Sequence, residues 1–200
     1  MARIGIISFA HMHAYSYADS LRTVPGVEFA AVWDADAKRG REAAARFGVK
    51  YHRDLGAFLK SDIDAVIVTS ENVRHREHVE AAAAAGKWVL CEKPLATTVA
   101  DAKAMVAACR KARVGLGTAF PVRYAPPIVE VKRRIASGEM GKVYAASCTN
   151  NGSYPGGWFS DPALSGGGAV MDHTVHVVDV LRWILGTEFV KVYCKSGTLI

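Results

Sequence analysis

The sequence has little that would crosslink the chain or gather a metal cluster. Its four cysteines, in 200 residues, lie far apart, and no Cys-x-x-Cys pair is present. A zinc ribbon and a thioredoxin-like redox motif are therefore not indicated. Widely spaced cysteines in a chain of mixed helix and strand patterns are typical of reduced, buried thiols in the cytosol. We expect a cytoplasmic protein without disulfides.

Long apolar runs are also missing. No run approaches the ~20 residues that a helix needs to cross a bilayer. The apolar start at residues 4–7 is too short for a signal peptide. We expect no membrane partner.

The charge is basic but scattered. The 25 Lys and Arg residues outnumber the 19 Asp and Glu residues, which gives a net charge of +6. Many cations fall on expected helix faces, at 103–113 and 132–134, and no nucleic-acid recognition motif accompanies them. We therefore expect no nucleic-acid partner, although a mildly positive field would favour an anionic ligand such as a dinucleotide.

The first 120 residues alternate between short strand-like runs and helical segments, which predicts βαβ units and a parallel sheet. We expect strands at 4–7, 27–33, 65–69, 88–91 and 115–118 in a sheet of about six. Helices are expected up to about residue 21, at 36–47, 54–60 and 75–85, and from Thr98 to about residue 111. Gly48 and Gly86 are suitable helix stops, and Thr98 with Asp101 resembles a capping box.

A proline-rich segment at 121–127 predicts a domain boundary. The first domain would be 1–120 and the second 121–200. The second begins with a helix to about residue 137, a strand at 142–150 and a glycine-rich loop at 151–168. A helix at 169–185 and a strand at 190–194 follow. Two strands alone would leave open edges, so we expect an incomplete α+β domain.

Two segments carry candidate chemistry. Glu92-Lys93-Pro94 follows the strand at 88–91, so Lys93 lies at the carboxyl end of a strand, where open α/β sheets bind ligands. Asp172 and His176, four residues apart on an expected helix, share one face. Lysine, aspartate and histidine in one pocket suit proton transfer to or from an alcohol.

These segments together resemble the family of glucose–fructose oxidoreductase and inositol 2-dehydrogenase (Gfo/Idh/MocA), over essentially the whole chain. The resemblance rests on 64–69, Asn72, His75, 86–87, 92–94, Arg123, 138–143 and the glycine run that leads to Asp172 and His176. It implies a Rossmann-type doubly wound parallel sheet followed by a substrate domain larger than the part present here. It also implies an NAD(P)-dependent oxidoreductase that assembles as a dimer or tetramer if the full substrate domain is present.

The phosphate loop departs from the family. Dinucleotide folds place Gly-x-Gly-x-x-Gly after the first strand, whereas residues 8–13 read Ser-Phe-Ala-His-Met-His. Ser8 and Ala10 are small enough to keep the turn if no positive φ is needed. His11 could donate to a phosphate or lie near the nicotinamide, and the helix N-terminus could still attract phosphate.

Asp34 ends the second expected strand, where an acidic residue bonds the ribose 2′-hydroxyl of NAD. The alternative is a turn or capping aspartate beside Asp36. Lys38 and Arg39 would soften discrimination against the phosphate of NADP. We predict NAD, with NADP the lesser partner.

The resemblance assigns further roles by position. Lys93 would contact cofactor and substrate, His176 would be the general base, and Asp172 would bind substrate or orient His176. Each has a plainer alternative, since Lys93 could be an exposed strand-end lysine and His176 a core histidine. The expected cofactor-binding residues are Ser8, Phe9, Ala10, His11, Met12, Asp34, Thr69, Ser70, Asn72, His75, Glu92, Lys93 and Arg123.

A metal centre is not expected. His11 with His13, His75 with His78 and His173 with His176 are pairs, but none has the helical i,i+4 zinc spacing and no cysteine pair assists. The glycine-rich loop also holds Tyr154 and Trp158, for which stacking on a sugar and core packing are equally open.

Three functions remain open. The first is a dehydrogenase that transfers hydride between nicotinamide and a secondary alcohol of a sugar, cyclitol or related polyol. The second is an NAD-assisted glycosidase, and the third is a non-catalytic dinucleotide or sugar sensor on the same fold. The sequence does not identify the substrate.

Overall fold

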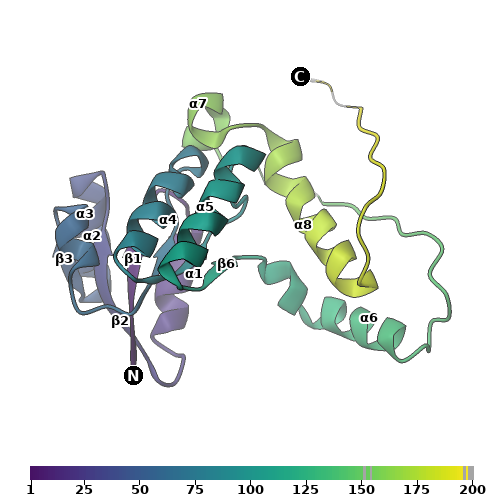
Figure 1. Cartoon of the computed structure of the whole chain (residues 1–200), viewed down its shortest axis with the longest axis horizontal. Coiled ribbons are helices and arrows are strands. Elements are labelled where there is room, and N and C mark those ends of the chain that lie inside the picture. The colour runs from purple at the N-terminus through teal and green to yellow at the C-terminus, as the bar shows by residue number, and fades with distance from the viewer. Residues whose placement is uncertain (151, 154, 196, 198–200) are drawn as a thin grey trace. The chain divides into compact units, whose positions relative to one another are not determined.

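The computed structural model describes residues 1–150, 152–153, 155–195 and 197 (Figure 1). The chain divides into two compact units. The first contains Met1–Ala119 with Ser153–Asp172, and the second contains Phe120–Gly152 with His173–Ile200. The segment 153–172 thus groups with the first unit, although it follows the proline-rich segment in sequence.

The first unit is built on one parallel sheet, in the order β3-β2-β1-β4-β5-β6. Its strands are β1 (Ala2–Ile7), β2 (Val27–Trp33), β3 (Lys50–His52), β4 (Ala65–Val68), β5 (Trp88–Cys91) and β6 (Leu116–Thr118). This order confirms the expected doubly wound, Rossmann-type sheet. It reverses between β1 and β4, and such switch points are where open α/β sheets bind ligands.

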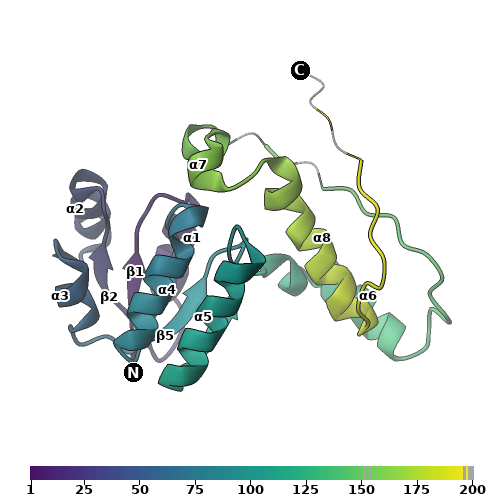
Figure 2. The same ribbon diagram turned by 45° about the horizontal axis from the view of Figure 1, so that its top comes forward.

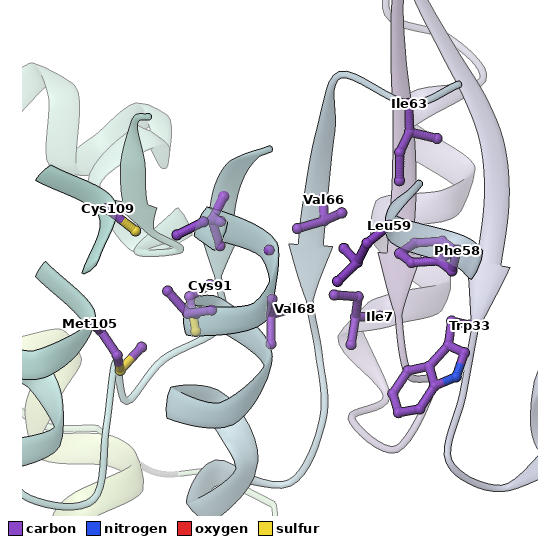
Figure 3. Packing of buried hydrophobic residues seen from close by; sticks show 14 of the residues in the cluster. Ile7, Trp33, Phe58, Leu59, Ile63, Val66, Val68, Cys91, Met105 and Cys109 are labelled. Carbon is purple, nitrogen blue, oxygen red and sulfur yellow. The ribbon is translucent and has the colours of Figure 1, made fainter. Parts of the chain in front are cut away.

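Strand alternation builds a core on each face of the sheet. Ile6 and Ile7 are both fully buried and point to opposite faces. Ile7 belongs to a cluster with Phe58, Val66, Val68 and Met105 (Figure 3), which packs the helices α3 (Leu55–Leu59), α4 (His75–Ala84) and α5 (Val99–Ala112) on one face of the sheet. Ile6 belongs to the other cluster, which packs the helices α1 (His13–Leu21) and α2 (Ala37–Phe47) through small and aromatic side chains including Ala14, Ala18, Ala43 and Phe47.

The helices of this unit begin and end largely where the sequence predicts. They are α1 (His13–Leu21), α2 (Ala37–Phe47), α3 (Leu55–Leu59), α4 (His75–Ala84) and α5 (Val99–Ala112), with the short turn η1 (Asn72–Arg74). In both views α4 and α5 lie side by side (Figures 1 and 2). Thr98 caps α5 by accepting the Asp101 N–H at 3.1 Å, and Gly48 ends α2 with φ 68°. The expected glycine-rich loop contains η3 (Gly157–Ser160) and α7 (Pro162–Ser165).

The second unit contains η2 (Pro121–Tyr124), α6 (Pro126–Ala136) and most of α8 (Ala169–Leu185). Residues 142–150 and 190–194 are not strands, so both sequence predictions there are wrong. A strand needs a neighbour to satisfy its backbone groups, and no such ladder forms at these residues in the described part of the chain. Among the described residues, no helix combines the length and apolar character that crossing a membrane requires.

Candidate active site

The loop after β1 keeps a tight turn without glycine. Ser8 takes over the first glycine position with φ 73°, a left-handed conformation that non-glycine residues rarely adopt. The sequence expectation allowed Ser8 to keep the turn only if no positive φ was needed, and the structure instead has the serine itself in that conformation. The backbone N–H of Ser8 donates to Trp33 O at 2.6 Å, and Thr69 Oγ1 donates to Ser8 O at 2.6 Å.

Asp34 is the acceptor around which this loop is organised. Its carboxylate is fully buried and accepts the Phe9 N–H at 2.7 Å. Arg39 donates to both of its oxygens, at 2.8 and 2.7 Å, and the Asp36 N–H donates at 2.8 Å. Ser8 Oγ lies 3.3 Å away. The carboxylate expected to bind a ribose hydroxyl is thus already surrounded by donors of the protein.

Glu92 lies buried where β5 ends and bridges to α1. It accepts from Tyr17 at 2.6 Å, contacts His13 Nδ1 at 2.7 Å and accepts the Lys93 N–H at 2.6 Å. Burial alone would raise the pKa of Glu92, but the bond from His13, the nearby His11 and the bond from Tyr17 outweigh it and lower the pKa to about 2. Glu92 is therefore a buried carboxylate anion. Sequence reasoning missed its partners, although His13 and Tyr17 are four apart on one helix face.

Lys93 and Asp172 are brought together across 79 positions of sequence. Lys93 is only 4% exposed, and its Nζ donates to Asp172 Oδ1 at 2.6 Å and to Asp172 O at 3.3 Å. Asp172 comes from the first turn of α8, in the part that belongs to the first unit. The alternative of an exposed strand-end lysine is therefore wrong. A buried ammonium held by one carboxylate is a strong donor at the carboxyl edge of the sheet.

Four further predicted residues follow β4 and are buried. Thr69 and Ser70 use their side chains inside the protein, Thr69 on Ser8 O and Ser70 Oγ with His78 Nδ1 at 2.8 Å. Asn72 Nδ2 donates to Ser165 O at 2.9 Å. Both ring nitrogens of His75 face backbone carbonyls, those of Pro94 and Ser70, at 2.9 and 3.2 Å. Burial lowers the pKa of His75, and the contacts with these carbonyls act in the opposite direction.

His176 and Arg123 belong to the second unit. The His176 ring lies edge-on to Phe120, with centroids 6.3 Å apart. Arg123 forms a two-pronged ion pair with Asp179, which is 4% exposed, and its Nε–Oδ2 distance is 2.6 Å. Bonds to Asp179 raise the pKa of Arg123. Arg123, expected near the cofactor, thus has its guanidinium held by α8 within this unit.

The loop that carries η3 reaches the phosphate-loop backbone. Trp158 Nε1 donates to Ala10 O at 3.0 Å and Trp158 stacks on Phe159, with centroids 3.8 Å apart. The indole thus contacts the protein itself at this point. Tyr154 lies outside the described residues.

One cluster has the composition of a metal site. His11, His13 and Glu92 each offer a ligand atom, and these atoms lie within 4.8 Å of one another. Two of the histidine nitrogens are already engaged, because His11 Nδ1 accepts the His13 N–H at 3.1 Å and His13 Nδ1 is in direct contact with Glu92. A hydrogen-bonded network accounts for these contacts better than a coordination shell does. The absence of a resident metal stays a prediction.

Comparison with known proteins decides the family. Residues 2–120 match the model of the oxidoreductase family with an NAD-binding Rossmann fold, and residues 128–200 match the GFO/IDH/MocA C-terminal domain. The chain belongs to this family. The Gfo/Idh/MocA resemblance inferred from the sequence is thereby confirmed.

Similar proteins include sugar and cyclitol dehydrogenases. The chain is 37% identical to inositol 2-dehydrogenase 2 of Saccharopolyspora erythraea over 94% of its length, and 36% identical to 1,5-anhydro-D-fructose reductase of Ensifer adhaerens, also over 94%. It is similar to the crystal structure of GenD2 from gentamicin A biosynthesis in complex with NAD, with a TM-score of 0.80, 29% identity and 92% coverage. The chain spans only 55%, 58% and 54% of these three proteins.

Proposed function

We propose that this Gfo/Idh/MocA chain is part of an NAD(P)-dependent oxidoreductase that acts on a secondary alcohol of a sugar, cyclitol or related polyol. The observation that carries the proposal is the buried Lys93–Asp172 pair at the carboxyl edge of the parallel sheet. The family model and the names of the relatives support the reaction class and the kind of substrate. Assembly as a dimer or tetramer is part of the same proposal.

The proposed chemistry divides between cofactor and protein. Bound nicotinamide supplies the hydride chemistry. Lys93 donates to the reacting hydroxyl and stabilises negative charge that develops on its oxygen. Asp172 holds the ammonium in place, and His176, at the position that the family resemblance gives to the general base, takes the proton. The dinucleotide site would be lined by the residues from Ser8 to Met12, of which Met12 is exposed, and by the buried residues after β4, namely Thr69, Ser70, Asn72 and His75.

The proposed cofactor is NAD in preference to NADP. A carboxylate at the end of β2, as in Asp34, disfavours a 2′-phosphate by repulsion. The partly exposed guanidinium of Arg39 contacts that carboxylate. Its positive charge would attract a 2′-phosphate and so reduce the preference for NAD over NADP. The preference is read from the ratio of dissociation constants for NADH and NADPH.

The first experiment is a titration of NADH, with NADPH in parallel, followed by energy transfer from tryptophan to the nicotinamide. Saturable binding that favours NADH, followed by turnover in a screen of polyols, is the expected result. No binding by a folded sample would overturn the proposed function. Tight retention of cofactor with no net release of NADH would instead favour the NAD-assisted glycosidase, and binding without turnover would favour a sensor.

Lys93→Ala tests the residues within that function. Loss of the donor that stabilises a developing alkoxide should reduce turnover by about 10²–10³ and alter NADH affinity much less. Lys87→Ala is a matched control, because Lys87 Nζ bonds backbone carbonyls at the opposite end of β5. Unchanged turnover in Lys93→Ala would refute the assignment of Lys93.

A further inference from the structure

Most backbone N–H groups of the loop after β1 already donate hydrogen bonds within the protein. In dinucleotide folds, free backbone N–H groups at this loop and at the following helix N-terminus hold the pyrophosphate. Here Phe9 N donates to Asp34, Ala10 N to Ser8 Oγ at 3.1 Å and His11 N to Thr69 O at 3.0 Å. His13 N donates to His11 Nδ1. A ligand at this loop would therefore find most of these N–H groups already committed to the protein.

The side chain of His11 supplies a donor in their place. It is 2% exposed, and its Nδ1 accepts the His13 N–H at 3.1 Å. Because a neutral imidazole carries one proton, acceptance at Nδ1 places the hydrogen on Nε2. His11 Nε2 is buried and has no hydrogen-bond partner among the described residues. Buried polar groups are normally bonded, and one that is not calls for an explanation such as a missing ligand.

His11 lies among aromatic rings and charged residues of the candidate site. Its ring lies 4.3 Å from that of His13 and 5.2 Å from that of Phe159, which stacks on Trp158. Glu92, Lys93 and Asp172 are near enough to act on it electrostatically. His11 thus lies at the junction of the phosphate loop with the Lys93–Asp172 pair.

We propose that the His11 Nε2–H is a positioning donor that binds an oxygen of the ligand in place of the N–H groups of a glycine loop. The inference rests on the proposed function and deepens it. The acceptor is a phosphate, ribose or carboxamide oxygen if the dinucleotide supplies it, and a hydroxyl oxygen if the polyol does. Both sources share one chemistry, a neutral N–H donating to oxygen in a dry site.

The charge state of His11 supports this role. Burial lowers the pKa of His11 to about 4, with His13 and Lys93 acting in the same direction and Glu92 and Asp172 opposing. At neutral pH the ring is therefore uncharged and has one N–H. It can orient an oxygen without acting as an acid or base, which separates its role from that proposed for His176.

The test compares a variant that lacks the donor with one that keeps it. His11→Phe preserves a planar ring, whereas His11→Gln preserves a side-chain N–H. His52→Phe is the matched control, because His52 is also buried with an unpartnered Nε2 but lies on the edge strand β3 beside Phe58. Circular dichroism checks folding, and His11→Leu replaces His11→Phe if the phenyl ring does not fit.

The expected result is a loss of roughly tenfold in ligand affinity for His11→Phe, a smaller loss for His11→Gln and none for His52→Phe. A raised dissociation constant for NADH assigns the acceptor to the dinucleotide, and a raised polyol KM with unchanged NADH affinity and kcat assigns it to the substrate. NADH binding with neither value changed in His11→Phe overturns this inference alone. No NADH binding by the unaltered chain overturns the proposed function and this inference together.

Cobalt(II) provides a second readout that needs no substrate. If His11 Nε2 were a metal ligand, one equivalent of cobalt(II) would give visible d–d absorption that His11→Phe and His13→Asn abolish. That result would overturn the assignment of Nε2–H as a donor. A spectrum without such bands agrees with the network of hydrogen bonds and supports the proposal.

Discussion

Asp34 Oδ2 accepts the backbone N–H of Phe9 at 2.7 Å, and this bond ties the end of β2 to the loop after β1. The same carboxylate pairs with Arg39. Asp34→Asn should lower the free energy of unfolding by about 2–4 kcal/mol, because it leaves the Arg39 guanidinium without its carboxylate and replaces an acceptor by a donor. Denaturant unfolding followed by circular dichroism measures the change.

Asp36→Asn is the control for Asp34→Asn. Asp36 is fully exposed and caps α2 by accepting the Lys38 N–H at 2.8 Å, and asparagine caps helices about as well as aspartate. The control should leave the free energy of unfolding nearly unchanged. Equal losses in the two variants would show that Asp34 does not organise the loop.

Ser8 has two opposing effects on the stability of the loop. Its φ of 73° strains the backbone, whereas its hydroxyl oxygen stabilises the turn by accepting the Ala10 N–H. Ser8→Ala keeps the left-handed backbone and loses the Oγ that accepts the Ala10 N–H. Ser8→Gly loses the same oxygen but relieves the backbone. The glycine variant should therefore be more stable than the alanine variant by about 1 kcal/mol. Thermal unfolding of the two variants decides this, and a more stable alanine variant would contradict the strained turn.

His176 should control the pH dependence of turnover if it is the general base. His176→Asn should reduce turnover by about 10²–10⁴ and remove the limb of the pH–rate profile that reports its titration. His173→Asn, on the same helix, is the control and should leave that limb in place. A profile with the same shape in His176→Asn would exclude His176 as the base.

The free energy of unfolding should decrease in mild acid because of His78, a buried histidine with no part in the proposed reaction. Burial, together with His75 and Arg74, lowers the pKa of His78 to about 4. The unfolded chain, with a histidine pKa near 6.5, binds this proton first, so the free energy of unfolding is retained above pH 6.5 and decreases as pH falls from about 6.5 to about 4. The slope is at most about 1.4 kcal/mol per pH unit for one histidine.

His78→Leu should flatten this part of the pH–stability curve relative to the unaltered chain, whatever it does to stability at pH 7. Unfolding in denaturant at a series of pH values gives the comparison. A curve that stays parallel to that of the unaltered chain would show that His78 is not the group that titrates.

Most of the parallel sheet could be predicted from the sequence, because buried strands and capped helices leave local patterns of residues. β3 was not predicted, because Lys50-Tyr51-His52 contains no run of apolar residues and the segment is a strand through its pairing with the longer β2. Residues 142–150 and 190–194 have strand-like composition, but a strand exists only where a neighbour bonds it, which local pattern does not reveal.

The sequence predicted which residues belong to the candidate site better than it predicted what each side chain contacts there. Lys93 and Asp172 could be chosen from motifs, and the structure joins them. Asp34 could be chosen as well, but its engagement with Phe9 and Arg39 depends on how three segments meet in space. The contact of His13 with Glu92 spans 79 positions, so no spacing rule finds it.

The backbone hydrogen bonds of residues 8–11 also imply how this loop behaves in time. The N–H groups of Ser8, Phe9 and His11 donate to Trp33, Asp34 and Thr69, at the ends of the central strands. Their exchange with deuterated solvent would require local opening of the sheet edge. A loop held in this way is ordered before a ligand arrives, so little conformational entropy remains to be lost on association.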